Sequence, residues 1–318
     1  MKKTGRKLMA MAVCTAMIAA MTGCGSTAEP ATTESTVSTE AKTVEATTEE
    51  AAATAATTAT TATTKSGYPI GDSVQAIIDK GVLVVGTDSA YAPFAFVDTT
   101  SDSSDPVGID VEIAKAIADE IGVDIQLEPM QFKALLSSLT AGMVDICIDG
   151  ITPTDERKEV ADFSDSYIEC QDRMMIQADR AEELSTLEDF YGKKIAANSG
   201  SIQEKFTQDF ITDADIFSSP NLPTSVMELK AGNVDGIVVE RSVGQQYLEA
   251  YPELTYSDAV MEGSYAKTYA VAMNKGCEDL QTVINGVVDK LVEEGKIEEW
   301  LTQYSELASK AVKANAAN

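Results

Sequence analysis

The chain contains no histidine and a single tryptophan, and aromatic residues make up only 6% of its 318 residues. Without histidine there is no imidazole general base, no Ser-His-Asp triad and no histidine metal ligand. Positive charge is scarce too, because 24 Lys and Arg stand against 51 Asp and Glu, which gives a net charge of −27. Such a charge repels nucleic acid and anionic membrane surfaces. We therefore expect a protein in contact with solvent and no nucleic-acid partner.

Cysteine is also sparse, and the spacing of the five cysteines does not match a zinc site. Cys14 and Cys24 lie near the N-terminus, which leaves three in the rest of the chain. Because three is an odd number, at least one of them stays free or pairs between chains. Cys147 lies in an apolar run and is most simply interpreted as a small buried hydrophobic residue.

The N-terminus has the pattern of a targeting segment. Residues 1–7 carry four positive charges and residues 8–21 are apolar, a run too short to span a bilayer as a stable helix. A small residue then stands directly before Cys24, which resembles the bacterial lipobox, although Met21 replaces the usual leucine. The resemblance implies a signal peptide over residues 1–23 and a diacylglycerol anchor on the sulfur of Cys24. An ordinary secretory signal with an incidental cysteine is the alternative.

After the cysteine, residues 25–66 consist almost entirely of Thr, Ala, Ser and Glu. They show no periodic apolar pattern and have nothing to bury, which is typical of a disordered segment. We therefore predict that residues 24–66 form a tether between the lipid and a folded part of the chain. A passive spacer is a sufficient interpretation.

From Tyr68 onward the pattern alternates between strand and helix. Apolar strands are predicted at 82–87, 124–130 and 143–148, with amphipathic helices between them. This βαβαβ order indicates a largely parallel sheet covered by helices. A second set of strands and helices follows from residue 173, and LKAGNVDGIVV (229–239) echoes SLTAGMVDICI (138–148). We therefore expect two similar α/β halves whose strand ends face a cleft.

The stretch GITPTDERKEVADFSDSY (150–167) says the most about function. It follows a predicted strand and opens a helix, with Thr154 as a good N-cap. Arg157 stands one turn into this helix, where a guanidinium can bind a carboxylate with two parallel hydrogen bonds. Strand ends followed by helix N-termini commonly bind anions in α/β proteins. The alternative is a plain helix cap with a solvated arginine.

With these pieces in place the sequence resembles the family-3 bacterial extracellular solute-binding proteins, the polar amino-acid receptors of ABC importers. Four motifs in the right order carry the resemblance, and together they cover about residues 70–305. They are GTDSAYAPF (86–94), GIDVEIAKAIA (108–118), GITPTDERKEVADFSDSY (150–167) and VDGIVVE (234–240).

The resemblance implies an α/β fold of the two-lobed, type II periplasmic-binding-protein class, a Venus flytrap with two crossover hinge strands. Lobe 1 would comprise residues 67–168 and 268–318, and lobe 2 would comprise residues 169–267. The crossovers near residues 168–169 and 267–268 would form the hinge.

The resemblance also implies how an amino acid would bind. Arg157 would bind the α-carboxylate, helped by the backbone N–H groups of Thr152, Ser201 and Ile202. The alternative for Arg157 is a cation on the helix surface.

The α-ammonium would be bound by the Gly150 carbonyl, the Thr152 hydroxyl and the Glu240 carboxylate, and Tyr91 and Phe132 would enclose the ligand side chain. The two rings could instead be ordinary core aromatics, and Glu240 could be a charge at the rim of the cleft.

The identity of the ligand is left open. Asp88 stands where the family often contacts the far end of the ligand, although it could instead cap its own turn. A carboxylate there suggests a cationic side chain such as that of Arg, Lys or His, but it can also accept from an amide or hydroxyl, as on Gln. A polar or basic ligand is therefore weakly favoured, an acidic ligand is disfavoured, and cystine stays open. Two departures from the family pattern, Glu240 in place of a more common Asp and Ala95 in place of a common Glu, weaken any statement of specificity.

We expect an extracytoplasmic, lipid-anchored, monomeric receptor that delivers a free amino acid to ABC permease subunits in the membrane. We expect no catalytic residue, metal or cofactor. One alternative is a sensor that presents the ligand to a membrane signalling partner. The other is a dehydratase on the same fold, in which a carboxylate and an arginine would carry out acid–base chemistry.

Overall fold

The computed structural model describes residues 62–101 and 103–316. The predicted signal peptide, Cys24 and the predicted tether up to residue 61 lie outside the described residues. Every described residue belongs to one packed unit. Among the described residues, no helix is long and apolar enough to cross a membrane.

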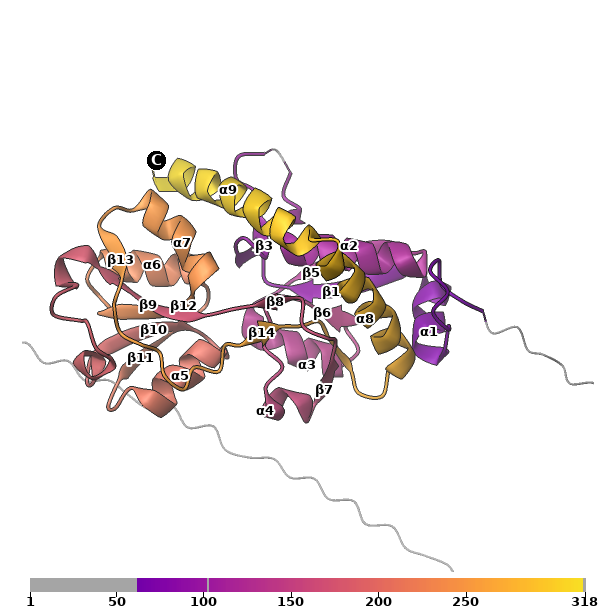
Figure 1. Ribbon diagram of the computed structural model, residues 1–318, viewed down its shortest axis with the longest axis horizontal. Helices are drawn as coiled ribbons and strands as arrows, with labels where there is room; N and C mark the ends of the chain where they lie inside the picture. Colours follow the sequence, from indigo (N-terminus) through magenta and orange to yellow (C-terminus); the bar gives the residue numbers. More distant parts are fainter. Residues whose placement is uncertain (1–61, 102, 317–318) are drawn as a thin grey trace, which may run out of the picture. The chain divides into compact units, whose positions relative to one another are not determined.

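The described part is built on two five-stranded sheets with the same plan (Figure 1). The strand order is β5-β1-β6-β15-β7 in the first sheet and β11-β10-β12-β9-β13 in the second. In each sheet the first three strands in the order are parallel and the last two run antiparallel to their neighbours. This is the two-lobed α/β fold that the resemblance implied.

Helices cover both sheets, as the alternating pattern predicts. The first sheet consists of β1 (Val82–Thr87), β5 (Asp124–Pro129), β6 (Ile146–Cys147), β7 (Ala161–Phe163) and β15 (Ala272–Asn274), with α1 (Asp72–Lys80), α2 (Ile109–Ile121), η1 (Phe132–Ala134), α3 (Leu135–Thr140), α4 (Asp155–Lys158), α8 (Glu278–Glu293) and α9 (Lys296–Ala316). The second consists of β9 (Asp172–Gln177), β10 (Lys194–Asn198), β11 (Asp215–Ser219), β12 (Gly236–Glu240) and β13 (Leu254–Tyr256), with η2 (Ala178–Arg180), η3 (Leu187–Phe190), α5 (Ile202–Phe210), α6 (Leu222–Lys230) and α7 (Arg241–Ala250).

The echoed sequence segments occupy equivalent places in the two sheets. The Asp145 carboxylate accepts the backbone N–H of Val84 at 2.7 Å, and the Asp235 carboxylate accepts that of Lys194 at 2.8 Å. In each lobe an aspartate therefore satisfies a backbone donor of the neighbouring parallel strand, β1 or β10. The repeat in the sequence is a repeat in structure.

Two crossing segments join the sheets. They pair as the short antiparallel strands β8 (Ile168–Glu169) and β14 (Thr268–Tyr269). Backbone bonds continue the pairing, since the Cys170 N–H donates to the Lys267 carbonyl at 3.0 Å. A separate small sheet of β2 (Ala90–Tyr91), β3 (Ala95–Val97) and β4 (Pro106–Val107) extends the first lobe.

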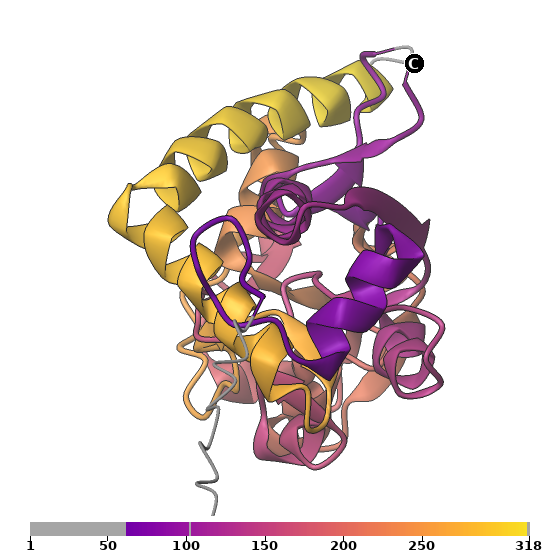
Figure 2. The ribbon, with the colours of Figure 1, turned by 90° about the vertical axis from the view of Figure 1, so that its right-hand side faces the viewer.

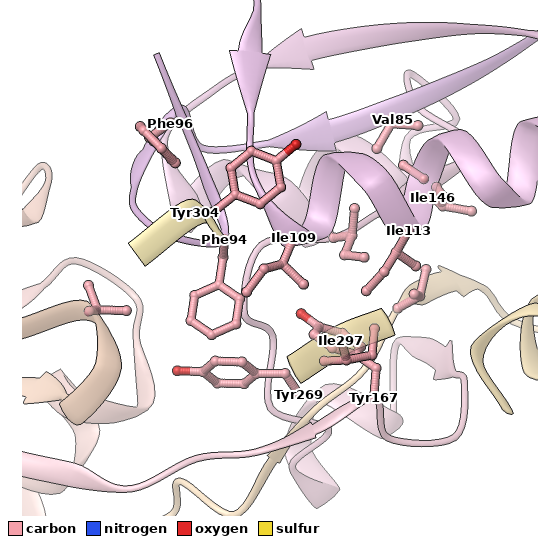
Figure 3. Close-up of a cluster of buried hydrophobic side chains, with 14 of the residues drawn as sticks. Val85, Phe94, Phe96, Ile109, Ile113, Ile146, Tyr167, Tyr269, Ile297 and Tyr304 are labelled. Carbon is pink, nitrogen blue, oxygen red and sulfur yellow. The ribbon is translucent and has the colours of Figure 1, made fainter. Parts of the chain in front are cut away.

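The core of the first lobe forms where α2 lies on the sheet. Ile109 and Ile113 of α2 are fully buried near Val85 and Ile146 (Figure 3), which agrees with the apolar face predicted for this helix. At one end of this cluster the ring of Phe94 meets the ring of Tyr269 edge-on, with centroids 5.1 Å apart. This aromatic corner supports the candidate site from behind.

Helix α9 extends from the first lobe toward α7 (Figures 1 and 2). Near its middle, the Tyr304 hydroxyl donates to Glu112 of α2 at 3.0 Å. Near its end, the Lys313 ammonium lies 3.4 Å from a carboxylate oxygen of Glu249 in α7. One helix thus contacts both lobes.

Residues 63–66, at the end of the predicted tether, contact the first lobe. The Thr64 hydroxyl and the Ser66 N–H both donate to Glu120 at the end of α2, each at 2.6 Å. The backbones of Thr63 and Pro69 also form an isolated antiparallel β-bridge. These hydrogen bonds to Glu120 explain why the residues just before Gly67 pack against α2. The sequence did not predict this, because the whole of residues 25–66 has the same Thr- and Ser-rich composition.

Candidate ligand-binding site

Arg157 is placed by the short helix α4. The Thr154 side chain accepts the Arg157 N–H at 3.2 Å, so Thr154 is the N-cap that the sequence predicted. The guanidinium donates to the Thr152 carbonyl at 3.0 Å and to the Gly200 carbonyl of the second lobe at 3.3 Å. Burial lowers the pKa of Arg157 to about 10, which leaves it charged at neutral pH.

Among the described residues, this guanidinium forms no ion pair. Within residues 62–101 and 103–316, no carboxylate lies within ion-pair distance of Arg157. Its other neighbour is an aromatic face, because its central carbon lies 5.3 Å from the ring centroid of Phe132. A half-buried cation bound only by carbonyls and a ring is suited to an incoming carboxylate.

The lobes approach closely beside Arg157. A Cβ on Gly200 would lie 3.0 Å from the Lys133 Cβ of the first lobe, and Gly200 has φ +76°. Glycine is therefore suited to this position by both conformation and space. The contact brings the start of α5 next to the Phe132 wall.

Tyr91 packs directly on Gly150. A Cβ on Gly150 would lie 2.8 Å from the Tyr91 ring, and Gly150 has φ +57°. The Tyr91 hydroxyl is 3.0 Å from that of Tyr269, and the Tyr91 ring stacks on Phe94 with centroids 5.8 Å apart. Phe94 is fully buried, so the half-buried Tyr91 forms the outer layer of this wall.

Thr152 contributes a polar atom without a partner. The residue is 5% exposed, and its hydroxyl oxygen has no hydrogen-bond partner in the described part of the chain. Buried polar atoms are nearly always hydrogen-bonded, so this hydroxyl beside Gly150 and Arg157 is available to a hydrogen-bonding partner.

Asp110 was missed by the sequence reasoning. It lies on the buried face of α2, where its carboxylate accepts the Gly150 N–H at 2.8 Å and the Tyr167 hydroxyl at 2.7 Å. Burial raises the pKa of Asp110 to about 7 against the opposing effect of these two bonds. Asp110 thus positions the peptide of Gly150. The only signal for it was a carboxylate on an otherwise apolar helix face.

Asp88 is engaged by backbone donors. Its carboxylate accepts the N–H of Ala90 at 3.1 Å and that of Phe132 at 3.3 Å, and burial raises its pKa. Its own N–H donates to the buried Asp149 at 3.0 Å. Asp88 therefore caps its own turn and also holds the Phe132 wall in place.

Two helix N-termini of the second lobe carry the remaining predicted residues. Ser201 caps α5 by accepting the Glu204 N–H at 3.1 Å, and its own N–H donates to Asn198 at 3.1 Å. Ile202 is the first residue of that helix. Glu240 caps α7 by accepting the Val243 N–H at 3.0 Å, and burial raises its pKa.

A cavity of about 1040 Å³ lies on the second-lobe side of the hinge. It is lined by the crossing segments and the start of α7, including Glu169, Cys170, Asp172 and Glu240. Asp172 is a second residue that the sequence reasoning missed, because nothing in its local pattern separates it from a surface strand end.

The profile of the bacterial extracellular solute-binding proteins, family 3, matches residues 83–306. The chain belongs to this family. The matched range spans both sheets and includes every site residue described above.

Relatives within the family are similar along most of their length. The L-cystine-binding protein TcyJ of Escherichia coli K12 is 27% identical over 221 residues, which cover 69% of this chain and 81% of TcyJ. The arginine-binding extracellular protein ArtP of Bacillus subtilis is 30% identical over 232 residues, which cover 70% of this chain and 87% of ArtP.

A solved structure of a family relative shows the same fold. The amino acid ABC transporter substrate-binding protein AbpA of Streptococcus pneumoniae, bound to L-arginine, superposes with a TM-score of 0.71 at 32% identity. The match covers 74% of this chain and 98% of AbpA.

The fold brings the predicted residues of this family member to one region. Six of them are linked by the first-lobe contacts given above: Asp88, Tyr91, Phe132, Gly150, Thr152 and Arg157. Ser201 and Ile202 directly follow Gly200, the second-lobe partner of Arg157. Glu240 caps α7 and lines the cavity beside the crossing segments. Contact of each residue with a ligand stays a prediction.

Proposed function

We propose that the protein is a membrane-anchored, extracytoplasmic receptor that binds a polar amino acid between its lobes and delivers it to an ABC importer. Basic amino acids are among the candidates. Lobe 1 would comprise residues 67–168 and 268–318, and lobe 2 residues 169–267. Membership of the family supports an extracellular solute-binding role, and Cys24 would carry the anchor.

The observation that carries the proposal is the unpaired guanidinium of Arg157. It extends from the first lobe to the Gly200 carbonyl of the second without meeting a carboxylate among the described residues. A free amino acid brings that carboxylate. Burying the two charges of the ligand without partners would cost several kcal/mol each, so closure must pair both of them.

The rest of the ligand would use the groups around Arg157. The Thr152 and Ile202 N–H groups would complete the carboxylate site, and that of Ser201 would join only by giving up its bond to Asn198. The Gly150 carbonyl, the Thr152 hydroxyl and Glu240 would accept from the ammonium.

The ligand side chain would lie between Tyr91 and Phe132, with Asp88 near its far end. Because the ligand would contact both lobes only when they are closed, binding would shift the population toward the closed form. That closed form would be the one that the permease subunits recognise.

The direct test is a thermal-shift screen of the full chain against the common amino acids, followed by calorimetry on those that bind. A ligand that binds only the folded state raises the melting temperature by mass action. We expect a shift with one or a few polar amino acids. If none of them shifts the midpoint, the amino-acid frame around Arg157 is wrong, and peptides or cyclic acids become the next candidates.

A sensor of the same ligand would need the same site, so the thermal-shift screen does not separate it from a transport receptor. Uptake of labelled ligand by cells that lack this protein does separate them, because an importer receptor is required for uptake. A dehydratase would instead convert its bound ligand, and mass spectrometry of the recovered ligand would reveal this.

A further inference from the structure

The first half of helix α9 is fixed to the first lobe. Figure 3 shows Ile297 and Tyr304 of this helix among the buried side chains of the first-lobe core. The Tyr304 hydroxyl donates to Glu112 of α2, and the Tyr304 ring meets that of Phe96 edge-on, with centroids 6.4 Å apart. This half of the helix therefore moves with the first lobe.

The second half of α9 packs on the second lobe. The principal partner of α9 is α7, along which its C-terminal turns lie (Figures 1 and 2). Ala308 and Ala311 continue the helix face of Tyr304 at a spacing of four and three residues, and they are 0% and 5% exposed. The buried Ser309 side chain hydrogen-bonds to Glu249 of α7 and lowers the pKa of that carboxyl. The contact therefore combines buried apolar packing with a polar end.

The apolar core of the molecule reflects this bridge. Among the described residues, one cluster of buried apolar side chains is confined to the first lobe and another to the second. The largest cluster contains residues of both lobes, including Tyr304 and Ala308 of α9 and Tyr247 of α7. The two lobes are thus not packed as independent bodies outside the crossing strands.

The contact between α7 and α9 lies away from the pivot of the lobes. Figure 1 shows α9 apart from the paired crossing strands β8 and β14, about which the lobes would turn. In the same structure the Arg157 guanidinium donates to the Gly200 carbonyl across the cleft. The two helices are therefore packed together while the lobes touch at the cleft. A rotation about the crossing strands changes the spacing of α7 and α9, and a closely packed contact does not stretch continuously.

We propose that residues 307–316 of α9 form a strap that favours the closed arrangement of the lobes and so sets the affinity for every ligand. These residues lie beyond the range that the family profile matches, which ends at residue 306. The effect on affinity rests on the proposed function, whereas the effect on the lobes does not. Because the strap touches no ligand, it changes the fraction of closed receptor, and the apparent affinity scales with that fraction.

The test places a charge inside the strap contact. Ala308→Glu keeps a good helix former but buries a carboxylate between the two helices, which disfavours their packing. Calorimetry on the full chain would measure the affinity for each amino acid that shifts the melting temperature of the wild type, beginning with L-arginine. We expect every affinity to fall by the same factor, about fivefold or more, because only the closed fraction changes.

A matched control separates this contact from the added charge. Gln303→Glu adds one negative charge at an exposed position of the same helix, and it should leave every affinity unchanged. If Ala308→Glu does not fold in denaturant titrations, a chain that ends at Leu307 takes its place, because it keeps Tyr304 and the first-lobe contacts of that ring. A folded variant with wild-type affinities, or with an altered preference between ligands, overturns the inference.

Small-angle scattering separates the strap from the proposed function, because it needs no ligand. Without added amino acid, Ala308→Glu should have a larger radius of gyration than the wild type and Gln303→Glu, all measured as full chains. Equal radii for the three proteins overturn the strap. A wild type that binds no amino acid, together with a variant that still expands, overturns the proposed function alone.

Discussion

The two lobes share a frame but differ where their equivalent strands end. Asp145 and Asp235 occupy equivalent places in the two sheets. Five residues after each of them stand Gly150 in the first lobe and Glu240 in the second. The first lobe thus presents a bare backbone beside Tyr91, and the second presents a buried carboxylate. The repeated frame therefore gives the two strand ends equivalent places in their sheets, while one residue at each end decides the charge presented there.

Both lobes contribute charges to the site. The first lobe supplies the guanidinium of Arg157 and the carboxylate of Asp88, and the second supplies Asp172 and Glu240, with Arg241 lining the same cavity. A ligand with one carboxylate and at least one ammonium matches both sides only when they are close together. On the proposed function, such a ligand would therefore favour the closed form over binding to either lobe alone.

Removing Arg157 should have the largest effect, because it deletes the cation of the first lobe. We expect Arg157→Ala to weaken amino-acid binding by about 3–5 kcal/mol, since the ligand carboxylate would stay buried and unpaired. Calorimetry would measure this. Lys158→Ala removes an exposed cation from the same helix and is the matched control. A loss below tenfold for Arg157→Ala would contradict its role.

Asp110 should make the first lobe sensitive to pH. Its folded-state pKa of about 7 exceeds the ordinary 3.8, so the folded protein holds a proton that the unfolded chain releases between these values. Stability should therefore fall as pH rises from about 4 to 7, by up to about 4 kcal/mol from this group alone. Denaturant unfolding of wild type and Asp110→Asn across this range checks it.

Comparing Asp110→Asn with wild type isolates the effect of Asp110 on the pH dependence of stability, because most other titrations cancel. The nearby Asp149 adds to the difference with the same sign, since the charge of Asp110 helps to raise the pKa of Asp149. As the pH rises, the unfolding free energy should fall less for Asp110→Asn than for wild type. Parallel pH profiles for the two proteins would show that Asp110 stays ionised in the folded state.

Gly150 tests the bare strand end of the first lobe. In Gly150→Ala the new Cβ would meet the Tyr91 ring at 2.8 Å in a left-handed backbone, and we expect a loss of about 1–3 kcal/mol in stability. Gly142 also has a positive φ but has no atom within 4 Å of a Cβ. Gly142→Ala therefore measures the backbone strain alone. Equal losses in the two variants would mean that Tyr91 moves aside freely.

The frame of this protein was predictable because it depends on local patterns. Alternating strands and amphipathic helices, the Thr154 cap and the repeated Val-Asp segments are all visible as spacing in the chain. The predicted strand at 143–148 is limited to Ile146–Cys147 in the structure, although the flanking N–H groups of Asp145 and Ile148 still donate to backbone carbonyls of β1. Patterns predict that an element exists better than they predict where it ends.

The acids of the site were less predictable, for a tertiary reason. Asp110 and Asp172 lie in or beside apolar elements, and their neighbours in sequence say nothing about burial. Only the packed fold places Asp110 under Gly150 and Asp172 opposite Glu240. The Glu240 side chain caps α7, a role that was not assigned to it from the sequence.

The smallest expected effect comes from the end of α9, where the two lobes meet outside the cleft. Lys313 and Glu249 lie 3.4 Å apart and are about half exposed, and Lys313 lies beyond the range that the family profile matches. An exposed pair of this kind contributes about 0.2–1 kcal/mol, and salt screens it. Lys313→Glu should therefore weaken ligand binding slightly, because the pair adds to the contact between the lobes.

The charge swap decides whether this pair acts between the lobes. Lys313→Glu combined with Glu249→Lys should recover the wild-type affinity, and the coupling measured by the cycle should shrink at high salt. If the single and double variants all bind like the wild type, the Lys313–Glu249 pair does not help to hold the lobes together. Closure would then depend on the ligand, on the apolar packing between α7 and α9 and on the contact between Arg157 and Gly200 within the cleft.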